Sequence, residues 1–184
     1  MQVKHFQIKG PMLFDIDAYK DHRGTFLEAF NESKMAPYIK ENFKQDNISY
    51  SNKNVVRGLH YQEKSPQGKL MYCLKGKILD VAVDIREGSS TFGQHVSVVL
   101  DAEEGHQAFY VPPGFAHGFA VHNNSDAVIL YKCTTLYEKE YDRVLSWNSA
   151  GIDLPKNFLG KEGMIMSEKD INGTPLSQTQ GVKV

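Results

Sequence analysis

The sequence has few cysteines, no long apolar run and almost no net charge. Its two cysteines, Cys73 and Cys133, lie far apart and outside CxxC spacing, which gives no support for a disulfide framework or a zinc site. A formal net charge of −1 excludes a general electrostatic attraction to nucleic acid or to an anionic membrane. No apolar stretch approaches transmembrane length, and the first residues lack the apolar segment of a secretory signal, so we expect a cytoplasmic protein.

The sequence also lacks a glycine-rich phosphate loop, a dinucleotide-binding fingerprint, internal repeats and low-complexity tracts. Its 184 residues, 41% hydrophobic and 23% charged, are enough for one substantial core. After about Trp147 the chain becomes rich in Gly, Asn and Pro, as in "NSAGIDLPKNFLGKEG". We therefore expect a single domain over residues 1–184, with its core over about 10–147 and a loop-rich C-terminal extension over about 148–184.

Strand signals dominate the predicted core. In "ILDVAVDIR", residues 78–86, apolar side chains alternate with Asp80, Ala82, Asp84 and Arg86, which is the period of a β-strand. "HVSVVLD" and "AVILYKC" are similarly rich in β-branched residues, and "QAFYVPPG" predicts a strand that two prolines and a glycine end. Turn residues recur about every ten positions, which is typical of a β-sandwich or barrel.

Two local features refine this all-β prediction. "LMYCLKGKILDV" predicts two strands joined as a hairpin at Lys75–Gly76. One helix is predicted near Ser33–Phe43, because Met35, Ile39 and Phe43 fall on one helical face, although Pro37 interrupts the pattern.

His60 is the first candidate for chemistry. On a strand over residues 55–62, alternation places Gly58, His60 and Gln62 on one face and Arg57 on the other. Gly58 would leave room for a ligand beside the imidazole. His60 then has three possible roles: a metal ligand, a proton-transfer base, or a hydrogen-bonded histidine of the core.

The metal role depends on a second motif. "VPPGFAHGF" is similar to the second motif of the cupins, in which a histidine, here His117, binds a metal. The first cupin motif supplies H-x-H, but here the matching residues read "HYQ", and the neutral amide of Gln62 is a poor replacement for imidazole. The motifs therefore predict a cupin-like fold and give no support for a metal.

Proton transfer needs more than one group. An imidazole has an unperturbed pKa of about 6.5, which suits a general base near neutral pH. Lys69 could stabilise a developing enolate, Tyr131 could return a proton from the opposite face, and Asp170 could orient the imidazole. The alternatives are a structural tyrosine in the core for Tyr131 and a solvated loop charge or cap for Asp170.

Further polar residues could bind an anionic, planar ligand. Arg23 and Arg57 could neutralise a diphosphate, and Tyr137 could stack on a nucleobase, although such charged residues also occur as ordinary solvated surface. We interpret His5, His22, His95, His106 and His122 as surface or structural residues.

Five segments in order resemble the dTDP-4-dehydrorhamnose 3,5-epimerase family of cupin-type sugar-nucleotide epimerases. They are "DHRGTFLEAFN", "FKQDNISYSNKNVVRGLHYQ", "QGKLMYCLKGKILDVAVDIREGSSTFG", "FYVPPGFAHGF" and "YKCTTLY", and the resemblance runs from about Gly10 to Pro175. It implies a cupin-type jelly roll (a double-stranded β-helix) with a few short helices. It also implies a homodimer without metal or other cofactor, which epimerises dTDP-4-dehydro-6-deoxy-glucose at C3 and C5 in dTDP-rhamnose biosynthesis.

The resemblance assigns roles to individual positions. It implies His60 as base, Asp170 as its support, Tyr131 as acid and Lys69 as the residue facing the enolate. The substrate contacts that it implies are Arg23, Glu28, Gln45, Asp46, Asn47, Arg57, His117, Tyr137, Asp142 and Lys169. Two positions depart from the family pattern: Asp142 stands where a longer glutamate is usual, and Leu154 stands in "GIDLP" where a tryptophan is usual.

Three other functions remain open at this point. A related enzyme could epimerise C3 or C5 alone, or shift the ketone. A metal-dependent cupin would need bound metal, and a non-catalytic protein could bind the sugar nucleotide without exchanging protons. The nucleotide itself, dTDP or another, is also open, because a stacking tyrosine accepts several bases.

Overall fold

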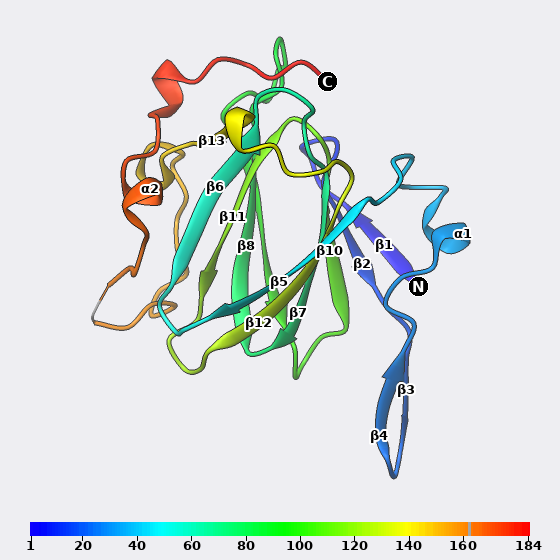
Figure 1. The fold of residues 1–184 in the computed structure, drawn as a ribbon. Helices are drawn as coiled ribbons and strands as arrows, with labels where there is room; N and C mark the ends of the chain where they lie inside the picture. The colour runs from blue at the N-terminus through cyan, green and yellow to red at the C-terminus, as the bar shows by residue number, and fades with distance from the viewer. Residues whose placement is uncertain (162) are drawn as a thin grey trace.

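The computed structural model describes residues 1–161 and 163–184, and two β-sheets with antiparallel strand pairing dominate it (Figure 1). The six-stranded sheet contains, in spatial order, β1 (Gln2–His5), β2 (Met12–Asp15), β10 (Gln107–Val111), β7 (Lys69–Lys75), β12 (Ala127–Cys133) and β5 (Gln45–Ser51). The five-stranded sheet contains β13 (Asp142–Val144), β6 (Val56–Gln62), β11 (Phe115–Val121), β8 (Lys77–Asp84) and β9 (His95–Asp101). This arrangement confirms the predicted all-β class.

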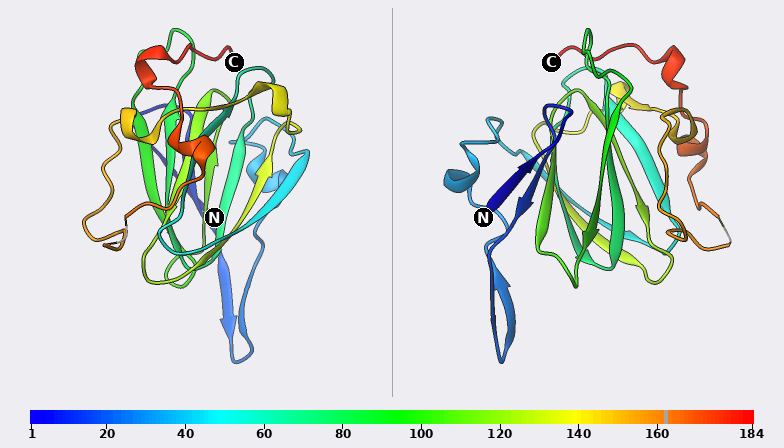
Figure 2. Two further views of the ribbon diagram at one scale, coloured as in Figure 1. Left: turned by 60° about the vertical axis from the view of Figure 1, so that its left-hand side comes forward. Right: turned by 180° about the vertical axis from the view of Figure 1, so that it is seen from behind.

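The remaining elements are short. β3 (Ala18–Asp21) and β4 (Gly24–Leu27) form a separate hairpin that projects away from both sheets (Figure 2). The helices are α1 (Glu32–Met35), α2 (Glu168–Ile171), and the 3₁₀ turns η1 (Lys139–Tyr141), η2 (Trp147–Ser149) and η3 (Leu176–Gln178). Within the described residues, none of them is long and apolar enough to cross a bilayer.

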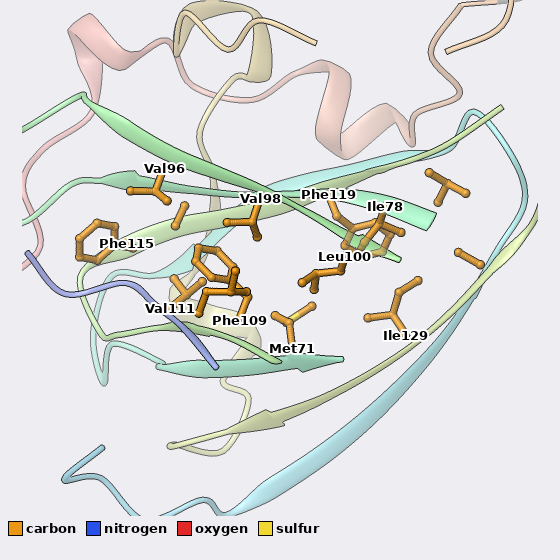
Figure 3. Close-up of a cluster of buried hydrophobic side chains, with 14 of the residues drawn as sticks. Met71, Ile78, Val96, Val98, Leu100, Phe109, Val111, Phe115, Phe119 and Ile129 are labelled. Carbon is orange, nitrogen blue, oxygen red and sulfur yellow. The ribbon is translucent and has the colours of Figure 1, made fainter. Parts of the chain in front are cut away.

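The main core lies between the two sheets. Met71, Phe109 and Ile129 from the six-stranded sheet meet Ile78 and Phe119 from the five-stranded sheet (Figure 3). Successive residues of a strand point to opposite faces, so the inward set on each strand builds a continuous apolar layer. Each large side chain that is fully buried in this way contributes about 1.5–3 kcal/mol to stability.

The C-terminal segment covers the outer face of the five-stranded sheet. Leu79, Val81 and Val83 on β8 pack in one cluster with Trp147 and Phe158. Figure 1 shows this segment, in orange and red, running outside β6. Both faces of β8 are therefore buried, which the alternation in its sequence did not indicate.

Residues 29–43 cover the outer face of the six-stranded sheet, and the helix predicted near Ser33–Phe43 is confirmed only at its start and is wrong in its length. Only α1 is helical, begun by the side chain of Asn31, which accepts the Lys34 backbone N–H at 3.1 Å. Pro37 has no N–H to continue the helical ladder, and the chain turns after Met35. Met35 and Ile39 still share one apolar face and are buried against the sheet.

The predicted hairpin at Lys75–Gly76 is also wrong. β7 belongs to one sheet and β8 to the other, where β8 pairs with β9 and β11. Gly76 makes the crossing possible, because its φ is +78° and a Cβ there would lie 2.5 Å from the carbonyl oxygen of Asp126. The turn was predicted correctly, but its two strands do not pair.

Candidate functional site

Two adjoining hollows open between the sheets and share three lining residues, His60, Lys69 and Tyr131. The larger hollow, of about 380 Å³, is further lined by Ile48, Ser49, Tyr50, Arg57, Met71, His117, Gly118 and Phe119. The smaller hollow, of about 230 Å³, is further lined by Gln45, Asn47, Tyr61, Gln62, Gln67, Tyr137 and Asp142. The shared residues stand where the two hollows meet.

The three shared residues come from opposite sheets. His60 lies on β6 of the five-stranded sheet, directly across from His117 on β11. Lys69 and Tyr131 lie on β7 and β12, which are neighbours in the six-stranded sheet. An imidazole and a phenol therefore face the same space from opposite sides.

A bulge in β6 brings Arg57 to the same side as His60, which corrects the prediction that Arg57 points away. Phe119 pairs with Arg57 and His117 with His60, so β6 carries one more residue than β11 between these pairs. The extra residue interrupts the alternation and redirects the side chain. Arg57 lines the larger hollow, and its Nε donates to the Ser51 Oγ at 2.9 Å.

Gly58, within this bulge, serves the strand pair and not a ligand. Its φ is +96°, and a Cβ there would lie 2.6 Å from the carbonyl oxygen of His117. The glycine therefore allows β6 and β11 to approach closely.

His60 is paired with the predicted aspartate. Its Nε2 lies 2.6 Å from Oδ1 of Asp170, which comes from α2 in the C-terminal segment; the His60 side chain is 36% exposed and that of Asp170 only 5%. Burial by itself raises the pKa of Asp170, but hydrogen bonds from His60, Ser167 and the Gly58 backbone outweigh it and lower that pKa overall. The aspartate is thus a carboxylate that accepts a ring N–H, which leaves the other ring nitrogen free to take a proton.

Burial shifts the pKa values of Lys69 and Tyr131, the two shared residues on the six-stranded sheet. Lys69 is only 9% exposed, and burial lowers the pKa of its ammonium group despite the opposing effects of Cys133 and Asp142. Tyr131 is half-buried, and burial raises the pKa of its phenol, which therefore stays protonated near neutral pH. A protonated phenol opposite an imidazole is suited to donate a proton.

His117 has its own buried aspartate. Its Nε2 lies 2.5 Å from Oδ1 of Asp80, and burial lowers the pKa of His117 although Asp80 opposes the shift. The imidazole is therefore neutral and donates its Nε2 hydrogen to Asp80. Sequence reasoning missed Asp80; the signal was a carboxylate in the middle of a strand whose neighbours Leu79 and Val81 are apolar.

A third set of side chains closes the smaller hollow. The Tyr137 hydroxyl donates to Oδ2 of Asp142 at 2.8 Å, and Lys169 Nζ donates to the same oxygen at 2.5 Å. Asp142 therefore joins the predicted residues Tyr137 and Lys169 at the rim. Gln45 and Asn47 lie on the same side, linked to each other at 3.0 Å.

Besides Lys169, which reaches the rim through Asp142, three predicted substrate contacts lie outside both hollows. Asp46 is on the outer face of β5, because its neighbours Gln45 and Asn47 point inward, and it binds Lys132 at 2.8 Å. Arg23 lies at the turn of the β3–β4 hairpin and binds Asp21, and Glu28 follows that hairpin and binds Lys34. The described chain does not bring these three to His60.

No group of three or more His, Cys, Asp or Glu side chains suited to a metal ion occurs in residues 1–161 and 163–184.

Comparison with known proteins identifies the family. The model of the dTDP-4-dehydrorhamnose 3,5-epimerase family matches residues 5–178. A dTDP-4-dehydrorhamnose 3,5-epimerase from Methanothermobacter thermautotrophicus is 41% identical over 174 residues, 93% of this chain and 92% of that protein. The chain belongs to the dTDP-4-dehydrorhamnose 3,5-epimerase family.

Solved structures agree with this membership. A dTDP-6-deoxy-D-glucose-3,5-epimerase from Legionella pneumophila, in complex with dTDP-4-keto-L-rhamnose, matches with a TM-score of 0.92 and 38% identity, covering 100% of this chain and 98% of that one. A 3′-monoepimerase from Streptomyces bikiniensis, in complex with dTDP-quinovose, matches with a TM-score of 0.84 and 29% identity, covering 94% and 86%. The predicted family, cupin-type β-fold and enzyme class, an isomerase, are confirmed.

Proposed function

We propose that the enzyme inverts C3 and C5 of dTDP-4-dehydro-6-deoxy-glucose to give dTDP-4-dehydro-L-rhamnose, a step of dTDP-rhamnose biosynthesis. The observation that carries the proposal is the placement of His60 and Tyr131 on opposite sheets around one shared space, with Lys69 beside them. Inverting a carbon requires a proton to leave from one face and another to arrive on the opposite face. A base and an acid on opposite walls meet that requirement.

The steps follow from the chemistry of a 4-keto sugar. The ketone acidifies the C–H bonds at C3 and C5, and His60, held by Asp170, removes one of these protons. The electrons of that bond form an enolate whose C4 oxygen is stabilised by Lys69. Tyr131 then donates its phenolic proton to the carbon from the opposite face. Exchange with solvent restores both groups, and the cycle repeats at the other carbon.

The nucleotide fits the smaller hollow and its rim. Tyr137 offers a half-exposed ring for stacking on the base, while Gln45, Asn47 and Lys169 offer polar contacts. We assign Arg57 to the diphosphate, because it lies at the larger hollow next to His60. The chain acts as one domain in this proposal, and its C-terminal extension supplies Asp170. The cytoplasmic location and the absence of a cofactor stay predictions.

Proton NMR of the reaction in D₂O tests the proposed function. We expect deuterium at both C3 and C5 and a product of the L-rhamno configuration. A product inverted at one carbon only would instead group the enzyme with monoepimerases, and dTDP binding without any deuterium incorporation would contradict catalysis altogether. We expect activity to survive dialysis against EDTA, whereas loss that Fe²⁺, Mn²⁺, Ni²⁺ or Zn²⁺ restores would favour a metal-dependent reaction.

We also propose a homodimer, which would bring two of the predicted contacts outside the hollows, Arg23 and Glu28, to a site. Arg23 and Glu28 sit on or next to a projecting hairpin whose paired residues Tyr19 and Phe26 are 64% and 70% exposed. On the six-stranded sheet, β5 is an edge strand with Ile48 and Tyr50 exposed. A second copy that covered these apolar surfaces would let each hairpin deliver its arginine to the partner's site.

Mixing two impaired variants, assayed at substrate concentrations below the KM of the Arg23→Ala variant, tests this arrangement. We expect Arg23→Ala to raise KM by roughly 10- to 100-fold, because it removes charge-assisted hydrogen bonds to phosphate. Co-refolded Arg23→Ala and His60→Ala chains should regain activity, because a heterodimer has one site that carries neither substitution. No recovery in the mixture, with dimers present by light scattering, would mean that Arg23 acts within its own chain.

A further inference from the structure

Gln62 stands two residues after His60, where a metal-binding cupin has its second histidine, and it is only 4% exposed. Its Oε1 accepts the backbone N–H of Glu138 at 2.6 Å. Its Nε2 donates to the carbonyl oxygens of Ser65 at 3.1 Å and Leu136 at 3.3 Å, with Oγ1 of Thr135 at 3.4 Å. An amide has an acceptor oxygen and two N–H donors, so these contacts engage both ends of the group.

Three of these four contacts go to one loop, residues 134–138, which connects β12 to η1, and the fourth goes to Ser65 in the turn after β6. Two neighbours of Gln62 along the chain hold the same loop: Gln67 Nε2 donates to the Thr135 carbonyl oxygen at 2.7 Å, and the Gly68 N–H donates to Thr134 Oγ1 at 2.8 Å. The turn after β6 and the loop after β12 are therefore tied together by polar contacts between two different sheets.

The loop carries Tyr137 to the smaller hollow. The Tyr137 backbone N–H donates to Oε1 of Gln45 at 2.9 Å, and its hydroxyl donates to Asp142. Tyr137 itself is 53% exposed and has little apolar packing to hold it, so its place depends on the backbone on either side. Gln62 binds that backbone on both sides, at Leu136 and at Glu138.

We propose that Gln62 is a positioning residue for nucleotide binding, which holds loop 134–138 so that Tyr137 stands ready over the smaller hollow. The inference rests on the proposed function, since it takes Tyr137 as the residue that stacks on the base. It also explains the departure from the metal-binding motif: both ends of the side chain at this position already bind the protein, with the oxygen turned to the backbone N–H of Glu138. A loop that is already ordered loses less conformational freedom when it binds.

Neither imidazole nor carboxylate can replace this amide. A histidine has no group that both accepts from Glu138 and donates to two carbonyl oxygens. A glutamate keeps the shape and the acceptor, but it places a carboxylate against the carbonyl oxygens of Ser65 and Leu136. Because the site is buried, water cannot supply the missing donors.

The test compares Gln62→Met with Gln107→Met. Gln107 makes one side-chain hydrogen bond, to Asp15 at 2.6 Å, and lies outside both hollows, so its variant controls for the loss of a glutamine. We expect Gln62→Met to raise the Kd for dTDP and the KM by about tenfold, with kcat within about twofold of wild type. The control should change none of the three. A fall in kcat at unchanged Kd would overturn the proposal.

A double-variant cycle shows whether Gln62 acts through Tyr137. In the Tyr137→Ala background we expect Gln62→Met to change the Kd for dTDP by less than about twofold, because the ring it positions is gone. Effects that multiply in the double variant would overturn the positioning role. If Gln62→Met does not fold, Gln62→Asn replaces it, because it keeps a neutral amide but is one methylene too short to reach the same partners, and we expect the same rise in Kd. A wild-type protein that binds dTDP but incorporates no deuterium would overturn the proposed reaction and leave this role, measured by binding alone, intact.

Discussion

Replacing His60 with alanine should lower deuterium incorporation at C3 and C5 by roughly 10²–10⁴-fold, with the fold retained. The reason is that the other imidazole of the site, that of His117, is buried and donates to Asp80. Both exchanges should fall together, because one base serves both carbons in the proposed cycle. The measurement is proton NMR of the 4-keto sugar nucleotide in D₂O.

The structure supplies the controls for this experiment. Removing the imidazole leaves Asp170 with partners at Ser167 and the Gly58 backbone, so the thermal unfolding midpoint should change little. His95→Ala is the matched control, since His95 lies on β9 at the edge of the five-stranded sheet and lines neither hollow. Exchange at the wild-type rate in His60→Ala would remove His60 from the role of base.

The substitution Asp170→Asn tests the contribution of the Asp170 charge while leaving the base, His60, in place. An asparagine can still accept the ring N–H through its oxygen, but it no longer carries the charge that stabilises the imidazolium formed when His60 takes up a proton. We expect kcat to fall while the Kd for dTDP stays the same, because Asp170 lines neither hollow. An unchanged kcat would mean that Asp170 only anchors α2.

Local patterns predicted the all-β fold well, because strand periodicity and turn chemistry are encoded within a few residues. The strands over "ILDVAVDIR" and "AVILYKC" and the end of the strand before Pro112 all occur in the structure. The pairing of strands could not be predicted in the same way. The Lys75–Gly76 turn joins two sheets, and nothing local to it distinguishes such a crossing from a hairpin.

The candidate site could likewise be predicted only in part from the sequence, because some of its contacts depend on strand pairing. His60, Lys69 and Tyr131 were named from the sequence together with the family resemblance, and the structure brings them to one space. The direction of Arg57 was missed because it depends on a bulge between β6 and β11. Asp80 was missed because its role depends on His117, which lies on the neighbouring strand and far along the chain.

Replacing Tyr131 with phenylalanine should separate proton removal from inversion. The variant keeps the ring, which packs against the inter-sheet core, and loses only the hydroxyl. His60 can still remove a proton and return a deuteron to the same face, so deuterium incorporation should persist. Formation of the inverted product should fall by roughly 10²–10⁴-fold, because the opposite face has lost its acid.

The pH dependence and a matched control sharpen this prediction. Burial raises the pKa of Tyr131, so its acid form persists across neutral pH, whereas burial lowers the pKa of Lys69. A fall in product rate below the ordinary tyrosine pKa of about 10 should therefore follow the loss of the Lys69 charge and not the deprotonation of Tyr131. Tyr110→Phe removes a different buried hydroxyl, bonded to Glu41 on the outer face, and should leave product formation unchanged.

Inverted product at the wild-type rate from Tyr131→Phe would show that another group donates the proton. Loss of exchange together with product would place Tyr131 in proton removal itself. The proposed roles, His60 as base and Tyr131 as acid, require that deuterium exchange at C3 and C5 persists in Tyr131→Phe while formation of the inverted product is lost.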